Sequence, residues 1–247
     1  MRRMADGRTA DVGLAHEAER VAAVGRRGVV ALLTLAGVAG LLFGASSLVQ
    51  YRCATRGCSP AVGHLWDVEA VGGLPRLFTT AIFLLVAVRA VLGSRTAHRR
   101  ARTWWSMVAV GGLVLAAAKL VSAHSAFETS DGRTRTLVAS LLLTVVALGI
   151  LTMTARRWSV PGAGPVVVAL AVYAAAALGL DAFTAVVEAV QGYVGARSHA
   201  VLGFVEEFGE ALAALLLLGA VGVGRSRVTS STASRTGWSG RSAPAGR

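Results

Sequence analysis

Residues 201–224 read VLGFVEEFGEALAALLLLGAVGVG, an apolar stretch interrupted only by three glutamates in its first half. A helix that crosses a lipid bilayer needs about 20 mainly apolar residues, so this stretch is long enough to span a membrane. Five earlier stretches meet the same requirement. The six predicted spans are residues 29–50, 75–92, 104–124, 136–154, 165–187 and 201–224.

The composition supports a membrane protein. Apolar residues make up 54% of the 247 residues, charged residues 15%, and the mean hydropathy is +0.61, which is too apolar for an ordinary soluble domain. We expect an all-α, polytopic membrane helix bundle over residues 29–224. The first span is expected to be retained, because the segment before it is too long for the start of a signal peptide.

Two basic segments flank the predicted bundle. Residues 1–28 and the tail, residues 225–247, are both expected to be disordered, the tail because it lacks apolar periodicity. A weakly amphipathic run at residues 12–24 leaves open the alternative that the first segment lies on the membrane surface.

The distribution of basic residues predicts the orientation. With the N-terminus inside, seventeen of the 25 lysines and arginines fall in the inner loops and termini, and six in or beside the outer loops. Short loops rich in lysine and arginine remain in the cytoplasm. The chain is therefore expected to lie in the plasma membrane with both termini cytoplasmic. Nine of the 13 carboxylates then fall on the outer side.

The net charge of +12 bears on the partners of the chain. The arginines cluster in short segments between apolar spans and form no patch on a soluble fold, so nucleic acid is not an expected partner. The expected partner is the lipid bilayer, with anionic lipid at the basic inner loops and tail. The sequence leaves open whether a protein partner exists.

The first outer loop, residues 51–74, contains both cysteines of the chain. Outside the membrane Cys53 and Cys58 could form a disulfide; two unpaired thiols are the alternative. Four intervening residues do not match the CxxC spacing of a redox motif, so a bridge here would be structural. Four tryptophans near predicted interfaces are expected to form aromatic belts. They are Trp66, Trp104, Trp105 and Trp158.

Acidic side chains in the last predicted span are candidates for a functional site, because an ionisable group at membrane depth is costly. Three glutamates share one helix face, which continues with alanines. Small residues permit close helix contact, whereas Phe208 and Leu215, on the opposite side, are expected to face lipid. The glutamates are Glu206, Glu207 and Glu210.

Two other spans place charged groups at the outer end. Asp181 and Glu188 are separated by about two helical turns and share a face with alanines. Lys119 lies near small residues of the third span, and the i,i+4 pair His124 and Glu128 follows it. The candidate polar site consists of Lys119, His124, Glu128, Asp181, Glu188, Glu206, Glu207 and Glu210.

Three interpretations of this polar site remain open. Lys119 could neutralise one carboxylate in a buried ion pair that locks the helices together. Carboxylates that cannot all ionise could hold a proton near neutral pH. With His64, His124 or His199 they could hold a divalent cation. The sequence contains no HExxH motif, so no cofactor is predicted, and a divalent metal is the alternative.

Three segments carry a resemblance, and the third of them is VSAHSAFE (121–128). WDVEAVGGLPRLFTTAIFLL (66–85) and VEEFGEALAALLLL (205–218) resemble the proline-containing helix entry and the paired-glutamate last helix of a family of uncharacterised bacterial multi-pass membrane proteins. His124 and Ser125 stand where that family more often has an acidic pair. The resemblance implies about six helices and no known reaction. It implies that the positions to test are Asp67, Glu69, Glu206, Glu207 and Glu210.

Three functions are compatible with the sequence. The first is a membrane protein, not an enzyme, with an outer-leaflet polar pocket for an ion, a proton, a lipid head group or a partner helix. The second is a membrane-embedded enzyme that uses Glu206 or Glu210 as general acid or base, with His124 or a metal, on a lipid-like substrate. The third is a small secondary transporter, for which no inverted repeat is visible.

Overall fold

The computed structural model describes residues 6–68, 70–121, 133–191 and 196–236, and over these ranges it contains seven helices and no strand. The helices are α1 (Asp6–Arg56), α2 (Pro60–Trp66), α3 (Leu74–Thr96), α4 (Arg99–Leu120), α6 (Arg133–Arg157), α7 (Ala163–Gln191) and α8 (Ala196–Thr236).

Five of these helices contain segments long and apolar enough to cross a membrane, and they overlap the first five predicted spans. The sixth predicted span, residues 201–224, lies inside α8, which is not one of the five. The five segments are Arg26–Arg56, Leu74–Thr96, Arg99–Leu120, Leu137–Arg157 and Ala163–Leu180.

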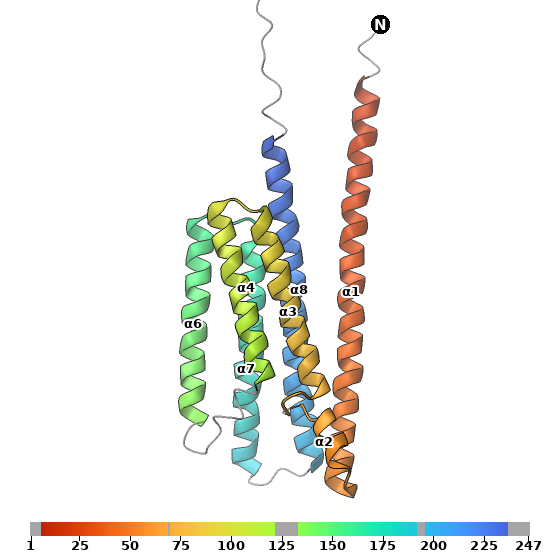
Figure 1. Ribbon diagram of the computed structural model, residues 1–247, viewed down its shortest axis with the longest axis vertical. Helices are drawn as coiled ribbons and strands as arrows, with labels where there is room; N and C mark the ends of the chain where they lie inside the picture. Colours follow the sequence, from red (N-terminus) through yellow and green to blue (C-terminus); the bar gives the residue numbers. More distant parts are fainter. Residues whose placement is uncertain (1–5, 69, 122–132, 192–195, 237–247) are drawn as a thin grey trace, which may run out of the picture.

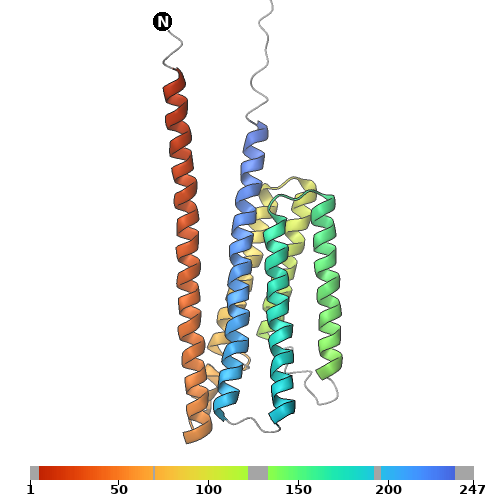
Figure 2. The ribbon, with the colours of Figure 1, turned by 180° about the vertical axis from the view of Figure 1, so that it is seen from behind.

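The long helices run side by side, with α8 near the middle (Figures 1 and 2). Helix α8 packs against α7, α1 and α3; α3 packs most extensively against α4, and α6 lies against α7. The first residues of α1 and the last residues of α8 lie at the same end of the bundle (Figure 1). We call this the inner end and the opposite one the outer end.

Both flanking segments are more helical than the sequence predicts. Helix α1 begins at Asp6 and continues without a break into the first span, and α8 continues to Thr236. Residues 6–28 and 225–236, within the segments predicted to be disordered, are thus described as helix. Helix formation is limited by nucleation, so a spanning helix that already exists extends at small cost into neighbouring residues that contain no proline. Residues 1–5 and 237–247 lie outside the described residues.

The core joins α3, α4, α7 and α8. Trp104 and Trp105 are 0% exposed and pack edge to face within it. The indole nitrogen of Trp104 donates a hydrogen bond to the carbonyl oxygen of Leu151 on α6, at 3.0 Å. The prediction of an aromatic belt is wrong for these two tryptophans, because their position near a helix end does not determine which way the rings point.

Helix α8 is covered on more sides than the predicted single face. Leu215, expected to face lipid, is 4% exposed and belongs to the core. Phe208 stacks on Phe204 and contacts Phe43 of α1, with ring centroids 5.1 Å and 6.3 Å apart. These contacts place α1 against the side of α8 that the sequence assigned to lipid.

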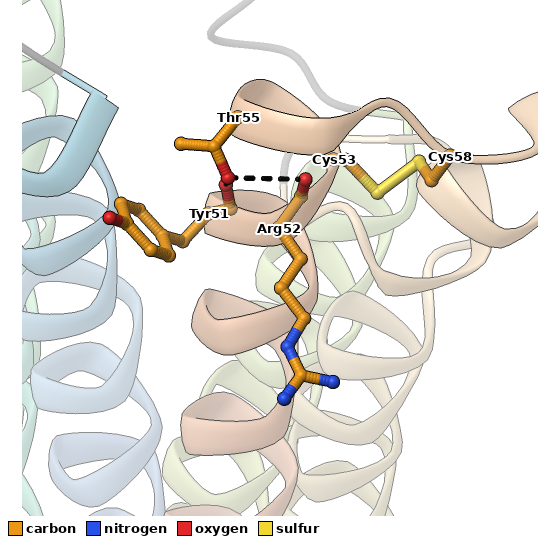
Figure 3. The surroundings of a disulfide bond; sticks show 5 residues. All are labelled: Tyr51, Arg52, Cys53, Thr55 and Cys58. Carbon is orange, nitrogen blue, oxygen red and sulfur yellow. Dashed lines mark hydrogen bonds between the residues drawn. A yellow bond between two sulfur atoms is a disulfide. The ribbon is translucent and has the colours of Figure 1, made fainter.

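At the outer end, a disulfide joins Cys53, in the last turns of α1, to Cys58, just beyond the helix (Figure 3). Two more contacts tie the following loop to α1. The hydroxyl of Ser46 donates to the carbonyl oxygen of Trp66, and the Gln50 amide donates to an Asp67 carboxylate oxygen at 3.2 Å. The outer loop therefore folds back on the helix that precedes it.

At the inner end, the turn before α7 lies directly against α8. Gly162 has a φ of 75°, and a Cβ atom at this position would lie 2.5 Å from the Cα atom of Gly224. A Cβ atom on Gly224 would in turn lie 2.9 Å from the Trp105 ring. The close approach of α7 and α8 thus requires two residues without side chains.

Replacing Gly162 with alanine should destabilise the bundle by at least about 2 kcal/mol, because the new methyl group meets both an unfavourable φ and a backbone. Gly164→Ala is the matched control, since nothing lies within 4 Å of a Cβ atom there. It should change stability by less than about 1 kcal/mol. Thermal unfolding in detergent measures both, and equal effects of the two substitutions would contradict the close approach.

Candidate functional site

The outer half of the bundle contains a buried group of charges from two helices. Nζ of Lys119, in the last turn of α4, lies 2.6 Å from Oε2 of Glu210 and 3.3 Å from Oε2 of Glu207, both on α8. Oε1 of Glu207 lies 3.5 Å from the same nitrogen. The three side chains are only 12%, 7% and 12% exposed. Three carboxylate oxygens therefore surround one ammonium group.

Tyr173 of α7 completes the group on one side. Its hydroxyl donates to Oε2 of Glu210 at 3.4 Å. The tyrosine ring packs edge to face on Phe83 of α3, with centroids 5.0 Å apart. Because Tyr173 is held by an aromatic contact and by a hydrogen bond, it fixes the position of the Glu210 carboxylate.

A second buried cation comes from the start of α3. Arg76 is 6% exposed; its Nε donates to the carbonyl oxygen of Val68 at 3.2 Å, and its Nη1 to the carbonyl oxygen of Lys119 at 3.3 Å. Through the carbonyl oxygen of Lys119, the guanidinium is joined to the same group of charges. Two cations thus balance two carboxylates, as low-dielectric surroundings require. We call Arg76, Lys119, Tyr173, Glu207 and Glu210 the outer cluster.

The sequence explains why these side chains meet. Glu207 and Glu210 are three residues apart, so they lie on the same face of α8. The small residue between them, Gly209, permits the approach of α7: a Cβ atom there would lie 2.8 Å from Leu180 Cδ1. Pro75 starts α3 in its first turn and places Arg76 at the helix entry, beside the outer loop.

The structure brings together only part of the predicted polar site. Lys119, Glu207 and Glu210 meet, and Glu206 lies half-buried on the same turn of α8. Asp67 accepts the hydrogen bond from Gln50. Seven other predicted positions are either exposed or have side chains outside the described residues.

Of these, His64 is exposed on α2. Asp181, Glu188 and His199 lie on described helices, but their side chains are outside the described residues, as are Glu69, His124 and Glu128 altogether. Among the residues that the structure does describe, no three histidine, cysteine, aspartate or glutamate side chains gather in a group that could hold a metal ion.

Arg76 and Tyr173 were missed by the sequence analysis. Arg76 was counted as a basic residue at the edge of an outer loop, and Tyr173 lies in an alanine-rich span with no charge near it in sequence. Arg76 carries a usable signal, since an arginine directly after the proline that opens an apolar helix falls inside a predicted span, where charged residues are rare. Nothing in the sequence distinguishes Tyr173 from a core aromatic residue.

No protein-family model, curated protein or solved structure matches this chain.

Removing the charge of Lys119 should be costly only while its partners stay charged. We expect Lys119→Met to lower the free energy of unfolding by about 3–5 kcal/mol, since it leaves carboxylates buried without their cation. Adding Glu210→Gln should restore part of that loss, giving a coupling of at least about 1 kcal/mol in a double-mutant cycle.

The control cycle pairs Lys119→Met with Arg156→Gln, an exposed position at the inner end of α6. The effects of these two substitutions on the free energy of unfolding should add within about 0.5 kcal/mol. Unfolding in detergent provides all the free energies. If the Lys119 and Glu210 effects are equally additive, the 2.6 Å contact does not stabilise the protein.

Proposed function

We propose that the chain is an integral membrane protein with six spans, both termini in the cytoplasm, whose outer cluster binds a small inorganic cation. Five helices that meet the length and hydropathy of a span support the membrane assignment. As the sixth span we take residues 201–224 of α8, which run alongside the other five (Figure 2). The termini of α1 and α8 lie at one end of the bundle, as an even number of crossings requires (Figure 1).

The orientation rests on two further features. The inner loops and termini contain seventeen basic residues and the outer loops six, a bias that keeps the basic side in the cytoplasm. The disulfide between Cys53 and Cys58 lies at the other end, and disulfides persist in oxidising compartments.

The two cysteines of the chain provide a test of the orientation. A membrane-impermeant maleimide added to intact cells should label Cys53 and Cys58 only after treatment with an impermeant reductant, because the pair is oxidised and faces outward. In a cysteine-free background, Ser230→Cys in the tail should be labelled only after the cells are permeabilised. Labelling of Ser230→Cys in intact cells would overturn the proposed topology.

The observation that carries the cation proposal is the ring of three carboxylate oxygens within 3.5 Å of Lys119 Nζ. A position surrounded by carboxylate oxygens suits a hard cation such as an alkali or alkaline-earth ion. The Lys119 ammonium occupies that position as a tethered cation. A free ion binds when the lysine side chain withdraws, so the two compete for Glu207 and Glu210.

Competition predicts that cations stabilise the purified protein and that Lys119 weakens their binding. Sodium, potassium, magnesium and calcium chlorides are compared with choline chloride at equal ionic strength, which controls for screening. At least one inorganic cation should raise the midpoint of thermal unfolding above the choline value. The effect should be lost in Glu207→Gln and Glu210→Gln.

Lys119→Met should bind the same cation at least about tenfold more tightly, since the competitor is gone. The wild-type measurement does not depend on whether this variant folds. If neither the wild type nor Lys119→Met distinguishes any inorganic cation from choline, the outer cluster is a structural lock and the cation site is wrong.

A further inference from the structure

The inner half of the bundle contains a cation that the outer cluster does not use. Arg89 lies on α3, seven residues before its last residue, Thr96, or about 10 Å from the inner end of the helix. It is exposed, and so are its apolar neighbours Leu85 and Val88, at 46% and 54%. A charged group that faces lipid at this depth is costly unless an anion reaches it.

The guanidinium of Arg89 lies over α8. Its Nη1 is 3.3 Å from the point where a Cβ atom of Gly222 would lie. The missing side chain of Gly222 thus leaves room for the arginine head against the helix. Within the described part of the chain, Arg89 has no hydrogen bond and no ion pair.

A second arginine emerges from the same face of α8. Arg225 follows Gly222 by three residues, so it lies one turn closer to the inner end on the same side of the helix. Helical side chains lean toward the N-terminus of their helix, which directs Arg225 toward Gly222 and the head of Arg89. Arg225 is half-buried and likewise unpaired among the described residues.

The apolar surface below these two arginines indicates what kind of anion fits. Leu85 precedes Arg89 by four residues and lies on the same face of α3, one turn deeper in the span. An occupant would meet two guanidinium groups at the level of the inner head groups and an exposed apolar strip beneath them. A phosphate group attached to acyl chains matches both parts, whereas a free phosphate ion matches only the first.

We infer that Arg89 and Arg225 form a binding site for the phosphate of an anionic phospholipid in the inner leaflet, with an acyl chain along Leu85. The site rests on the six-span arrangement proposed above, and not on cation binding at the outer cluster. It differs from the diffuse attraction of the basic loops because its two arginines come from α3 and α8, with the head of Arg89 at Gly222 and Arg225 one helical turn further along α8.

The test titrates dioleoylphosphatidylglycerol into the detergent-solubilised full chain and follows the midpoint of thermal unfolding. The lipid should raise the midpoint, and Arg89→Gln and Arg225→Gln should each weaken its apparent affinity at least about tenfold. Arg89→Lys keeps the charge but loses the planar, bidentate donor group, so it should lose less affinity than Arg89→Gln without reaching the wild-type value. Arg95→Gln and Arg100→Gln, at exposed positions where α3 ends and α4 begins, are matched controls and should bind as the wild type does.

Two further ligands distinguish a site for an anionic lipid from binding of any lipid or of free phosphate. Dioleoylphosphatidylcholine should give little stabilisation, and inorganic phosphate at the same concentration should give none. Equal effects of the two lipids, or full stabilisation by inorganic phosphate, would overturn the lipid site. An equal loss of affinity in the two control variants, Arg95→Gln and Arg100→Gln, would also overturn it, because the attraction would then be diffuse. Failure of the topology test with wild-type binding intact would contradict the membrane arrangement and not the arginine pair.

Discussion

The contact between Lys119 Nζ and the Glu210 carboxylate, at 2.6 Å, constrains the whole outer half of the molecule. An ammonium and a carboxylate that are both nearly buried have no access to water, so each depends on the other for its solvation. Helix α4 therefore cannot slide along α8 without leaving two charges unpaired. Tyr173 extends the constraint to α7, since its hydroxyl donates to the same carboxylate. A single polar contact thus fixes the relative height of three helices that apolar packing alone would leave free to shift.

Arg76 explains how the outer loop joins this arrangement. Its guanidinium donates to the carbonyl oxygens of Val68 and Lys119, so it connects the loop, the start of α3 and the end of α4. Because Val68 follows the segment that Ser46 and Gln50 tie to α1, polar contacts run from α1 to α8 across the outer end. Binding at the carboxylates would have to disturb at least one of these contacts. A change at the site would therefore also affect the outer loop.

The features of the structure that depend on the periodicity of apolar and polar residues could be predicted from the sequence. Apolar length predicted the helices, and the shared face of Glu207 and Glu210 predicted that they point into the bundle. The sequence could not show which helix packs against each face. Leu215 and Phe208 were assigned to lipid because a helical wheel shows one polar face and not that α1, α3 and α7 surround α8. Tyr173 and the buried Trp104 and Trp105 were missed for the same reason, since the direction of an aromatic side chain is settled by tertiary packing.

The two ends of the bundle differ in how their charged side chains are balanced. At the outer end, two cations and two carboxylates come from the chain itself, so the charges are balanced without help. At the inner end, Arg89 and Arg225 have no carboxylate partner among the described residues, and the close approach of Gly162 to Gly224 leaves little room for one on α7. Among the described residues, this end of the bundle therefore has a local excess of positive charge. In the lipid site that we propose, the phosphate of a phospholipid supplies the negative charge that balances it.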